Sequence, residues 1–251
     1  MSDKGLHHVI DRNFGSFKGI VLITMLIFLF IDSRNHMHTR LLKLAGIGLI
    51  SILAIGCAHK GTVSSIRATN IYSDSDKKLP GNVVYTVDQT SLTKLQVTDT
   101  VKGILCGAHT FPVDAADAFK QSFPLMLDQV FENIRQSDTP SKDGVSLIFR
   151  VERFEPTIRF TSKFFGADGT ATVEMGVSVV GNKNGARVFG TTVDTQRTKN
   201  GEAGLYCSDG GQIVADAVRD AAKDILEKLG ERMANSPSLK AALVASPGVK
   251  K

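Results

Sequence analysis

The run ATVEMGVSV at Ala171–Val179 is the most regular pattern in the chain. Its odd-numbered positions are apolar, and its even-numbered positions are polar or glycine. Successive side chains of a strand point to opposite faces, so this alternation predicts a strand with one buried and one solvated face. Such strands are typical of an antiparallel sheet that is covered on one side.

Turn residues and further strand patterns surround this run. Gly181–Gly185 (GNKNG) contains residues that tolerate positive φ, which predicts a hairpin turn. The return strand is expected over about 187–195, and the polar run to Gly204 is expected to be a loop. Earlier strands are expected over 83–87, 92–97, 145–152 and 158–164, and residues 101–106 extend the first pair.

The segment Phe119–Ile134 predicts an amphipathic helix, because its apolar residues recur at spacings of three and four. Asp114 is the expected N-cap. Pro124 lies inside the pattern, so either the helix kinks there or Ser122 caps a new helix that has Pro124 in its first turn.

A second helix is expected over Ile213–Leu229, opening at Ser208–Gly211 and stopping at Gly230. Its many alanines allow close approach to a sheet. The order of elements predicts an α+β fold: an antiparallel sheet of about four to five strands, with two helices packed on one face.

The run Met37–Cys57 (MHTRLLKLAGIGLISILAIGC) indicates where the protein is located in the cell. Arg40 and Lys43 precede an apolar and small-residue stretch, Leu44–Gly56, which is the signature of an export signal. With Cys57 directly after it, the segment resembles the bacterial lipoprotein lipobox. The resemblance implies cleavage before Cys57, a lipid on its thiol and acylation of the new amino group, with palmitate-type chains. The alternative is an ordinary signal or a short membrane anchor with a chance cysteine.

These patterns divide the chain into five parts. A separate apolar run at Gly19–Ile31 is short for a membrane span. Residues 1–36 are therefore an upstream extension that anchors the precursor, or they reflect a start assigned ahead of Met37. The remaining parts are a signal peptide at 37–56, a tether at 57–81, a periplasmic α+β domain at 82–233 and a mobile tail at 234–251. Ala58 in place of Asp resembles the sorting signal for the outer membrane, so we expect the lipid anchor in that membrane, facing the periplasm.

Charge and histidine content exclude several function classes. Residues 1–56 hold six of the 30 Lys and Arg residues and three of the 25 Asp and Glu residues, which leaves a net charge of only +2 on residues 57–251. A partner nucleic acid is therefore not expected. Five of the six histidines, His59 included, precede the predicted domain, and His109 alone remains in it. We therefore expect no metal site, no cofactor and no catalytic triad.

Cys106 and Cys207 each lie in a predicted loop ahead of a predicted helix. The envelope permits disulfides, so these two cysteines are expected to form one bond between the two helix entrances. The alternative is a pair of buried or unpaired thiols.

The stretch Ala118–Arg232 resembles envelope lipoproteins of the YajG-like and ABC-transport-auxiliary type, with relatives among the curli-secretion lipoproteins. The shared pattern is a helix like Phe119–Ile134, a strand pair like ATVEMGV with Arg187–Gly190, and an alanine-rich final helix. The loop around Cys106 and the break at Pro124 depart from this pattern. The resemblance implies no catalytic residues.

No residue cluster indicates an enzyme. The nearest carboxylate pairs, Asp114 with Asp117 and Glu152 with Glu155, are better explained as helix capping and solvated strand charge. Anion binding at Ser208–Gly211 is less expected than simple capping. The predicted function is a non-enzymatic outer-membrane lipoprotein, a binding or assembly subunit of an envelope transport or secretion complex. Its partners would be the membrane, through Cys57, and an envelope protein or a second copy of the chain. The alternatives are a lipid- or peptidoglycan-binding accessory and an enzyme with an unrecognised site.

Overall fold

The computed structural model describes residues 57–139 and 144–244. The chain divides into two compact units, and the second, which begins at Gly56, contains every described residue. The predicted extension (1–36), the predicted signal peptide (37–56) and the last residues of the predicted tail (245–251) lie outside the described residues. Within the described residues, no helix combines the length and apolar character that crossing a bilayer requires.

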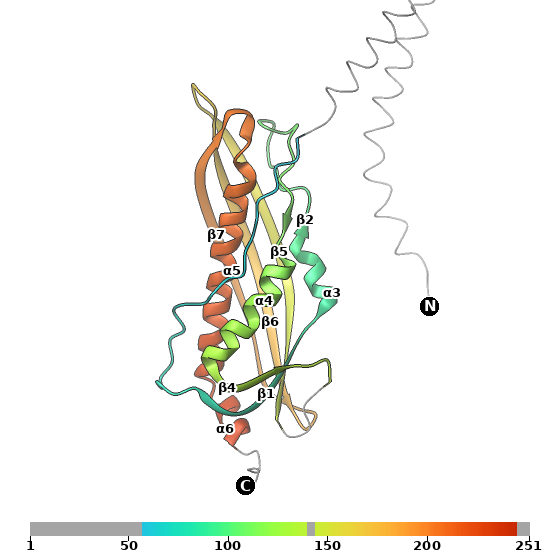
Figure 1. The fold of residues 1–251 in the computed structure, drawn as a ribbon, viewed down its shortest axis with the longest axis vertical. Helices are drawn as coiled ribbons and strands as arrows, with labels where there is room; N and C mark the ends of the chain where they lie inside the picture. Colours follow the sequence, from blue (N-terminus) through green and yellow to red (C-terminus); the bar gives the residue numbers. More distant parts are fainter. Residues whose placement is uncertain (1–56, 140–143, 245–251) are drawn as a thin grey trace, which may run out of the picture. The chain divides into compact units, whose positions relative to one another are not determined.

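A five-stranded sheet with the order β4-β1-β5-β6-β7 forms the centre of the fold (Figure 1). The strands are β1 (Leu79–Val87), β4 (Phe131–Gln136), β5 (Val145–Ser162), β6 (Ala167–Lys183) and β7 (Ala186–Gly204). The last three form an antiparallel meander. β1, however, pairs in parallel with both β4 and β5, so the prediction of an antiparallel sheet was wrong in this half. The physical reason is connectivity, since the chain crosses over through a helix between β1 and β4, and crossover connections join parallel strands.

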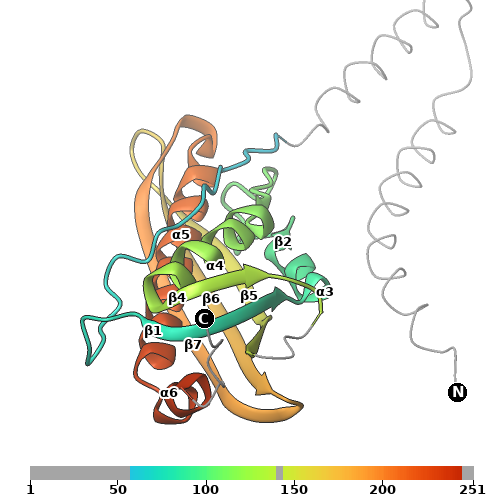
Figure 2. The ribbon, with the colours of Figure 1, turned by 60° about the horizontal axis from the view of Figure 1, so that its bottom comes forward.

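Two long helices, α4 (Ala116–Val130) and α5 (Gly210–Ala234), pack on one face of the sheet, as predicted (Figures 1 and 2). In the core between α4 and β5, the ring of Phe123 contacts Phe119 edge-on and Phe149 at a tilt. Two short helices complete the α+β fold, α3 (Gln89–Leu92) and α6 (Pro237–Val244). The smaller elements are the 3-10 turns η1 (Thr93–Leu95) and η2 (Leu205–Cys207) and the two-residue strands β2 (Gln96–Val97) and β3 (Val113–Asp114).

The strand predicted at 92–97 is confirmed only over Gln96–Val97, and the strand predicted at 101–106 was wrong. The first segment forms η1 and β2, and the second forms a turn with a single bridge at Val101. Asp88 is the N-cap of α3, since its side chain accepts a hydrogen bond from the Thr90 amide at 3.0 Å. The cap turns the chain out of the sheet directly after β1.

The strands predicted over 145–152 and 158–164 are one strand of 18 residues, β5. Its pairing with β6 shifts register between Val151 and Arg153. Before this bulge the buried apolar residues are odd-numbered, as at Phe149, and after it they are even-numbered, as at Ile158. One extra residue moves every later side chain to the opposite face, which is why the two halves look like separate strands.

The predicted hairpin turn is confirmed at Asn184 and Gly185, whose φ angles are 51° and 79°. Two central residues with positive φ match the right-handed twist of the flanking strands. The strand after the turn runs to Gly204, so the loop expected after Thr195 was wrong. Arg197 and Lys199 of this stretch pair with Asp224 and Asp220 of α5.

The helix predicted to Ile134 ends at Val130, because Phe131 takes extended angles (φ −119°, ψ 150°) and begins β4. Pro124 lies within the single helix α4, so a new helix capped by Ser122 does not form. The predicted cap Asp114 lies in β3, one residue before the structural cap position. It nevertheless accepts from the Ala116 amide at 3.2 Å.

The segment predicted as a tether, residues 57–81, is packed on the domain in the structure. Residues 57–78, termed the strap below, have no regular helix or strand, yet they pack along α4 and α5 (Figure 1). Ile66 is buried, and its amide donates to the Ser122 hydroxyl at 2.7 Å. Further along, a carboxylate oxygen of Glu227 accepts from the amides of Thr69 and Asn70, both at 2.9 Å. The strap is therefore part of the folded domain.

Two further boundaries change for the same reason. Gly230, expected to stop the last helix, lies inside α5, and a Cβ there would meet Ile71 of the strap at 2.6 Å. The predicted mobile tail begins with α6, whose Leu239 and Leu243 are buried. Residues 234–244 therefore belong to the folded unit as well.

Candidate functional site

The chain enters its folded unit at Cys57, beside the loop that leads to α4. The Thr110 amide donates to the Cys57 carbonyl at 3.1 Å, and the His59 amide donates to the Thr110 carbonyl at 2.8 Å. These two bonds form a short parallel bridge that fixes the backbone here. The Cys57 side chain itself is exposed and carries a free thiol. The predicted lipidation residue is thus held in place with an accessible sulfur.

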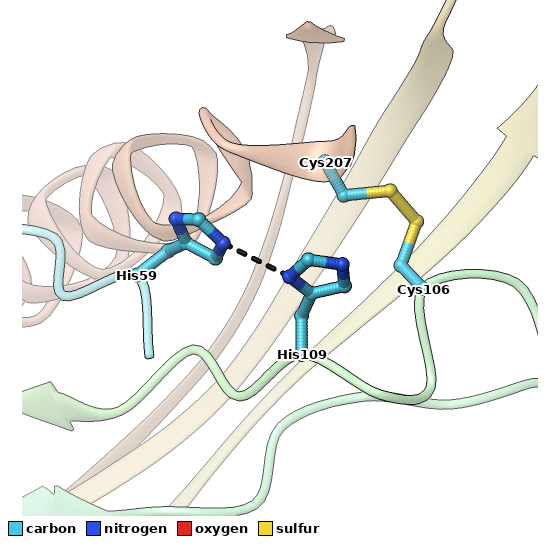
Figure 3. Close-up of a disulfide and its surroundings, with 4 residues drawn as sticks. All are labelled: His59, Cys106, His109 and Cys207. Carbon is cyan, nitrogen blue, oxygen red and sulfur yellow. Dashed lines mark hydrogen bonds between the residues drawn. A yellow bond between two sulfur atoms is a disulfide. The ribbon is translucent and has the colours of Figure 1, made fainter. Parts of the chain in front are cut away.

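His59 and His109 form a pair next to this bridge (Figure 3). Nε2 of His59 and Nδ1 of His109 are 3.0 Å apart, and the His59 ring stacks on Phe111 with centroids 5.6 Å apart. The expectation that His59 precedes the domain was wrong, because the strap returns it to the fold. No local signal connects two histidines that are 50 residues apart in the sequence.

The expectation of no metal site rested on His109 being alone in the domain, and the position of His59 removes that reason. A sulfur of Cys57 and ring nitrogens of both histidines lie within 4.8 Å of one another. A thiolate with two imidazoles suits zinc or copper. The lipid predicted on Cys57 would convert its sulfur to a thioether and leave two imidazoles, which do not complete such a set.

A disulfide lies beside the histidine pair (Figure 3). Cys106, in the loop that precedes Thr110, is bonded to Cys207 at the end of η2, with their Cα atoms 6.2 Å apart. Both residues have left-handed backbone angles, φ 61° at Cys106 and φ 60° at Cys207. The bond joins the loop next to Cys57 directly to the start of α5.

A carboxylate with three side-chain partners lies elsewhere, against the helix-covered face of β7. Asp224 of α5 accepts from Thr195 and Arg197 of β7, and from Lys228 at 2.7 Å. Partial burial acts to raise the pKa of Asp224, but hydrogen bonds from Lys228, Thr195 and Arg197 outweigh it and hold the pKa below its usual value. The Asp224 carboxylate joins β7 to α5 through these hydrogen bonds, so its role is structural.

The predicted carboxylate pairs form no acid–base site. Asp114 caps the start of α4, and Glu152 accepts from Ser178 across the sheet. Asp117 and Glu155 are exposed. These positions agree with the capping and solvated-charge interpretations.

Two of the hollows on the described surface have similar volumes. One of about 310 Å³ lies between the β5–β6 hairpin and η2, lined by Phe165 and Leu205 among others. The other, of about 300 Å³, lies at the opposite end of β5, lined by residues such as Val84 and Ile148. Asp138 and Thr139 also line it.

Comparison with known proteins assigns no family. No family model and no curated protein matches the chain. Among solved structures, it aligns with a Xanthomonas campestris protein carrying the DUF330 family model, at 14% identity and a TM-score of 0.38, over 70% of this chain and 93% of that one. It also aligns with a minor lipoprotein of Acinetobacter baumannii, at 9% identity and a TM-score of 0.38, over 63% and 93% respectively. Values this low establish neither a shared family nor a shared function, so the YajG-like resemblance stays a prediction.

Proposed function

We propose that this chain is a bacterial envelope lipoprotein, held on the membrane by lipid on Cys57 and acting as a non-enzymatic binding or assembly subunit. The proposal is supported by the agreement between the predicted cleavage site and the start of the folded unit. The lipobox predicts a cut between Gly56 and Cys57, and the folded unit begins at Gly56. The predicted signal peptide thus ends where the folded unit begins, and Cys57 presents an exposed sulfur.

A subunit of an envelope complex needs a surface for its partner, and β7 supplies one. It is an edge strand of 19 residues, and among the described residues its outer edge pairs with no other strand. Unpaired strand edges accept an added strand from another chain. Arg232 of α5 donates to the Thr192 carbonyl and so occupies part of this edge. A protein partner or a second copy along the remainder of β7 is the role we favour over a lipid- or peptidoglycan-binding accessory.

The enzyme alternative would use the same cysteine. A thiol near an imidazole is the arrangement of a cysteine nucleophile, and the Cys57 sulfur lies within 4.8 Å of both histidine rings. Acylation of Cys57 would consume that thiol. The covalent state of this one residue therefore separates the two functions.

The test is the intact mass of the protein purified from its own membranes, together with metabolic labelling by an alkyne-bearing palmitate. We expect the mass of residues 57–251 plus acyl chains, and label that is lost in Cys57→Ser. Ala58→Ser is the matched control and should keep both cleavage and label. A chain that retains residues 1–56 and takes up no label would overturn the proposal. Flotation on a density gradient then separates outer-membrane from inner-membrane attachment.

A further inference from the structure

Large exposed apolar side chains are concentrated at one end of the described domain. Six of the nine that the described residues expose lie there: Ile104, Leu105, Phe164, Phe165, Leu205 and Tyr206. We term these six residues the apolar tip. Ile104 is 99% exposed, Phe164 92% and Tyr206 83%. Single exposed apolar residues are ordinary on a protein surface, but such a concentration marks an interaction site.

The apolar tip is built from three loops that are tied together. Ile104 and Leu105 lie in the loop of Cys106, which the disulfide joins to η2, where Leu205 and Tyr206 lie. The third loop is the β5–β6 hairpin, which carries the phenylalanine pair. It is joined to η2 by the pairing of Ala167 with Gly204 at the ends of β6 and β7. The three loops therefore present their apolar side chains as one surface.

The same end of the domain carries Cys57. The Cys57 carbonyl is bonded to Thr110, four residues after Cys106 in the loop that contributes to the apolar tip. Figures 1 and 2 both place the start of the strap, the hairpin and the beginning of α5 at this end. The apolar run Leu44–Gly56 directly precedes Cys57 in the sequence. A membrane attached at Cys57, through lipid or through that run, therefore meets the domain at the apolar tip.

We propose that the apolar tip inserts into the surface of the bilayer that holds Cys57 and so fixes the orientation of the domain on the membrane. The proposal deepens the proposed function and rests on membrane attachment at Cys57. Aromatic side chains such as Phe and Tyr favour the interfacial layer of a bilayer, where an apolar ring is buried and a hydroxyl stays hydrated. Burial of apolar side chains of the apolar tip adds to the membrane binding that the lipid provides.

The chain contains no tryptophan, so a single introduced Trp reports its own surroundings. The reporters are Phe165→Trp and Tyr206→Trp, in the full mature protein reconstituted into vesicles of phosphatidylethanolamine and phosphatidylglycerol. Tyr72→Trp is the control. Tyr72 is exposed, and its carbonyl accepts from Asn235 at the far end of the 25-residue helix α5, about 35 Å from the apolar tip.

We expect blue-shifted emission and strong quenching by lipids brominated in their acyl chains for the two reporters in the apolar tip, and neither effect for Tyr72→Trp. Adding Phe164→Ser should reduce quenching of the Tyr206→Trp reporter. Ile148→Ser, which removes an exposed apolar side chain elsewhere, should leave that quenching unchanged.

The outcomes separate this inference from the proposed function. An acylated protein whose reporters stay unquenched would overturn insertion and leave the lipid anchor intact. A blue shift without quenching by brominated lipid would mean that a second copy or another protein covers the apolar tip, and would also overturn insertion. Quenched reporters on a chain that carries no lipid would uphold insertion while the lipoprotein proposal fails.

Discussion

Removing the disulfide should cost the domain much of its stability. The bond joins residues 101 positions apart, and the enclosed segment contains α4 and the four strands β4 to β7. In the loop-entropy model, closing a loop of this length in the unfolded chain is worth about 4.7 kcal/mol at 25 °C. The proposed change is Cys106→Ala with Cys207→Ala in the mature protein.

Relief of backbone strain in the native state offsets part of this loss of stability. Both cysteines hold left-handed backbone angles that cost non-glycine residues on the order of 1 kcal/mol each, and they can relax once the bond is gone. The expected net loss is therefore about 2–4 kcal/mol, which for a domain of this size lowers the melting temperature by roughly 5–15 °C. Since domains are stable by about 5–15 kcal/mol, the variant should still fold.

Urea unfolding followed by circular dichroism measures the effect. The variant should unfold at a lower midpoint and with a steeper dependence on urea, because its unfolded chain is no longer held compact. Reductant should lower the midpoint of the unmodified protein to a similar degree and leave the double variant unchanged. A midpoint in the double variant equal to that of the unmodified protein, or labelling of Cys106 by a thiol reagent without prior reduction, would refute the reasoning.

Three other changes test the fold. Asp224→Asn should destabilise the domain by about 1–3 kcal/mol at pH 7. Because the folded pKa of Asp224 is depressed, its contribution is full above the unfolded value of about 4 and is lost as pH falls through the folded value, so acid titration of stability should be shallower in the variant. Gly230→Leu should push Ile71 away and loosen the strap, seen as faster hydrogen exchange at the Thr69 amide, whereas unchanged exchange would contradict the packing described here. Gly185→Ala meets no atom within 4 Å, so only its φ of +79° opposes the change, and urea unfolding should show a loss of roughly 1 kcal/mol.

Local patterns predicted the parts of the fold that depend on local chemistry. The alternation at Ala171–Val179 gives β6, and Asn184 and Gly185 form the expected turn. Phe131–Gln136 could not be predicted in this way, because Ile134 continues the helical spacing of α4. Those residues become β4 only because β1, about 50 residues earlier, offers an unpaired edge.

The strap shows the same limit. Its polar composition resembles a linker, and it is ordered only by distant partners in α4 and α5, above all Glu227 and the bare backbone at Gly230. The residues of the apolar tip form a pattern in the sequence. Ile104-Leu105, Phe164-Phe165 and Leu205-Tyr206 are three pairs of large apolar residues at the ends of predicted strands or in predicted loops. Their meeting at one end depends on pairings that no single segment reveals.

The docked strap decides how far the domain can move from its anchor. A flexible linker of about 24 residues would place the domain at a root-mean-square distance of about 27 Å from its anchor. With the strap packed along α5 that reach is lost, so the proposed lipid on Cys57 would hold the domain at the membrane surface. β7 then runs from the apolar tip to the turn at Asn184, and its 19 residues span about 60 Å when extended. On this proposal, a protein that pairs with the β7 edge would extend from the same membrane or contact the domain at a fixed height above it.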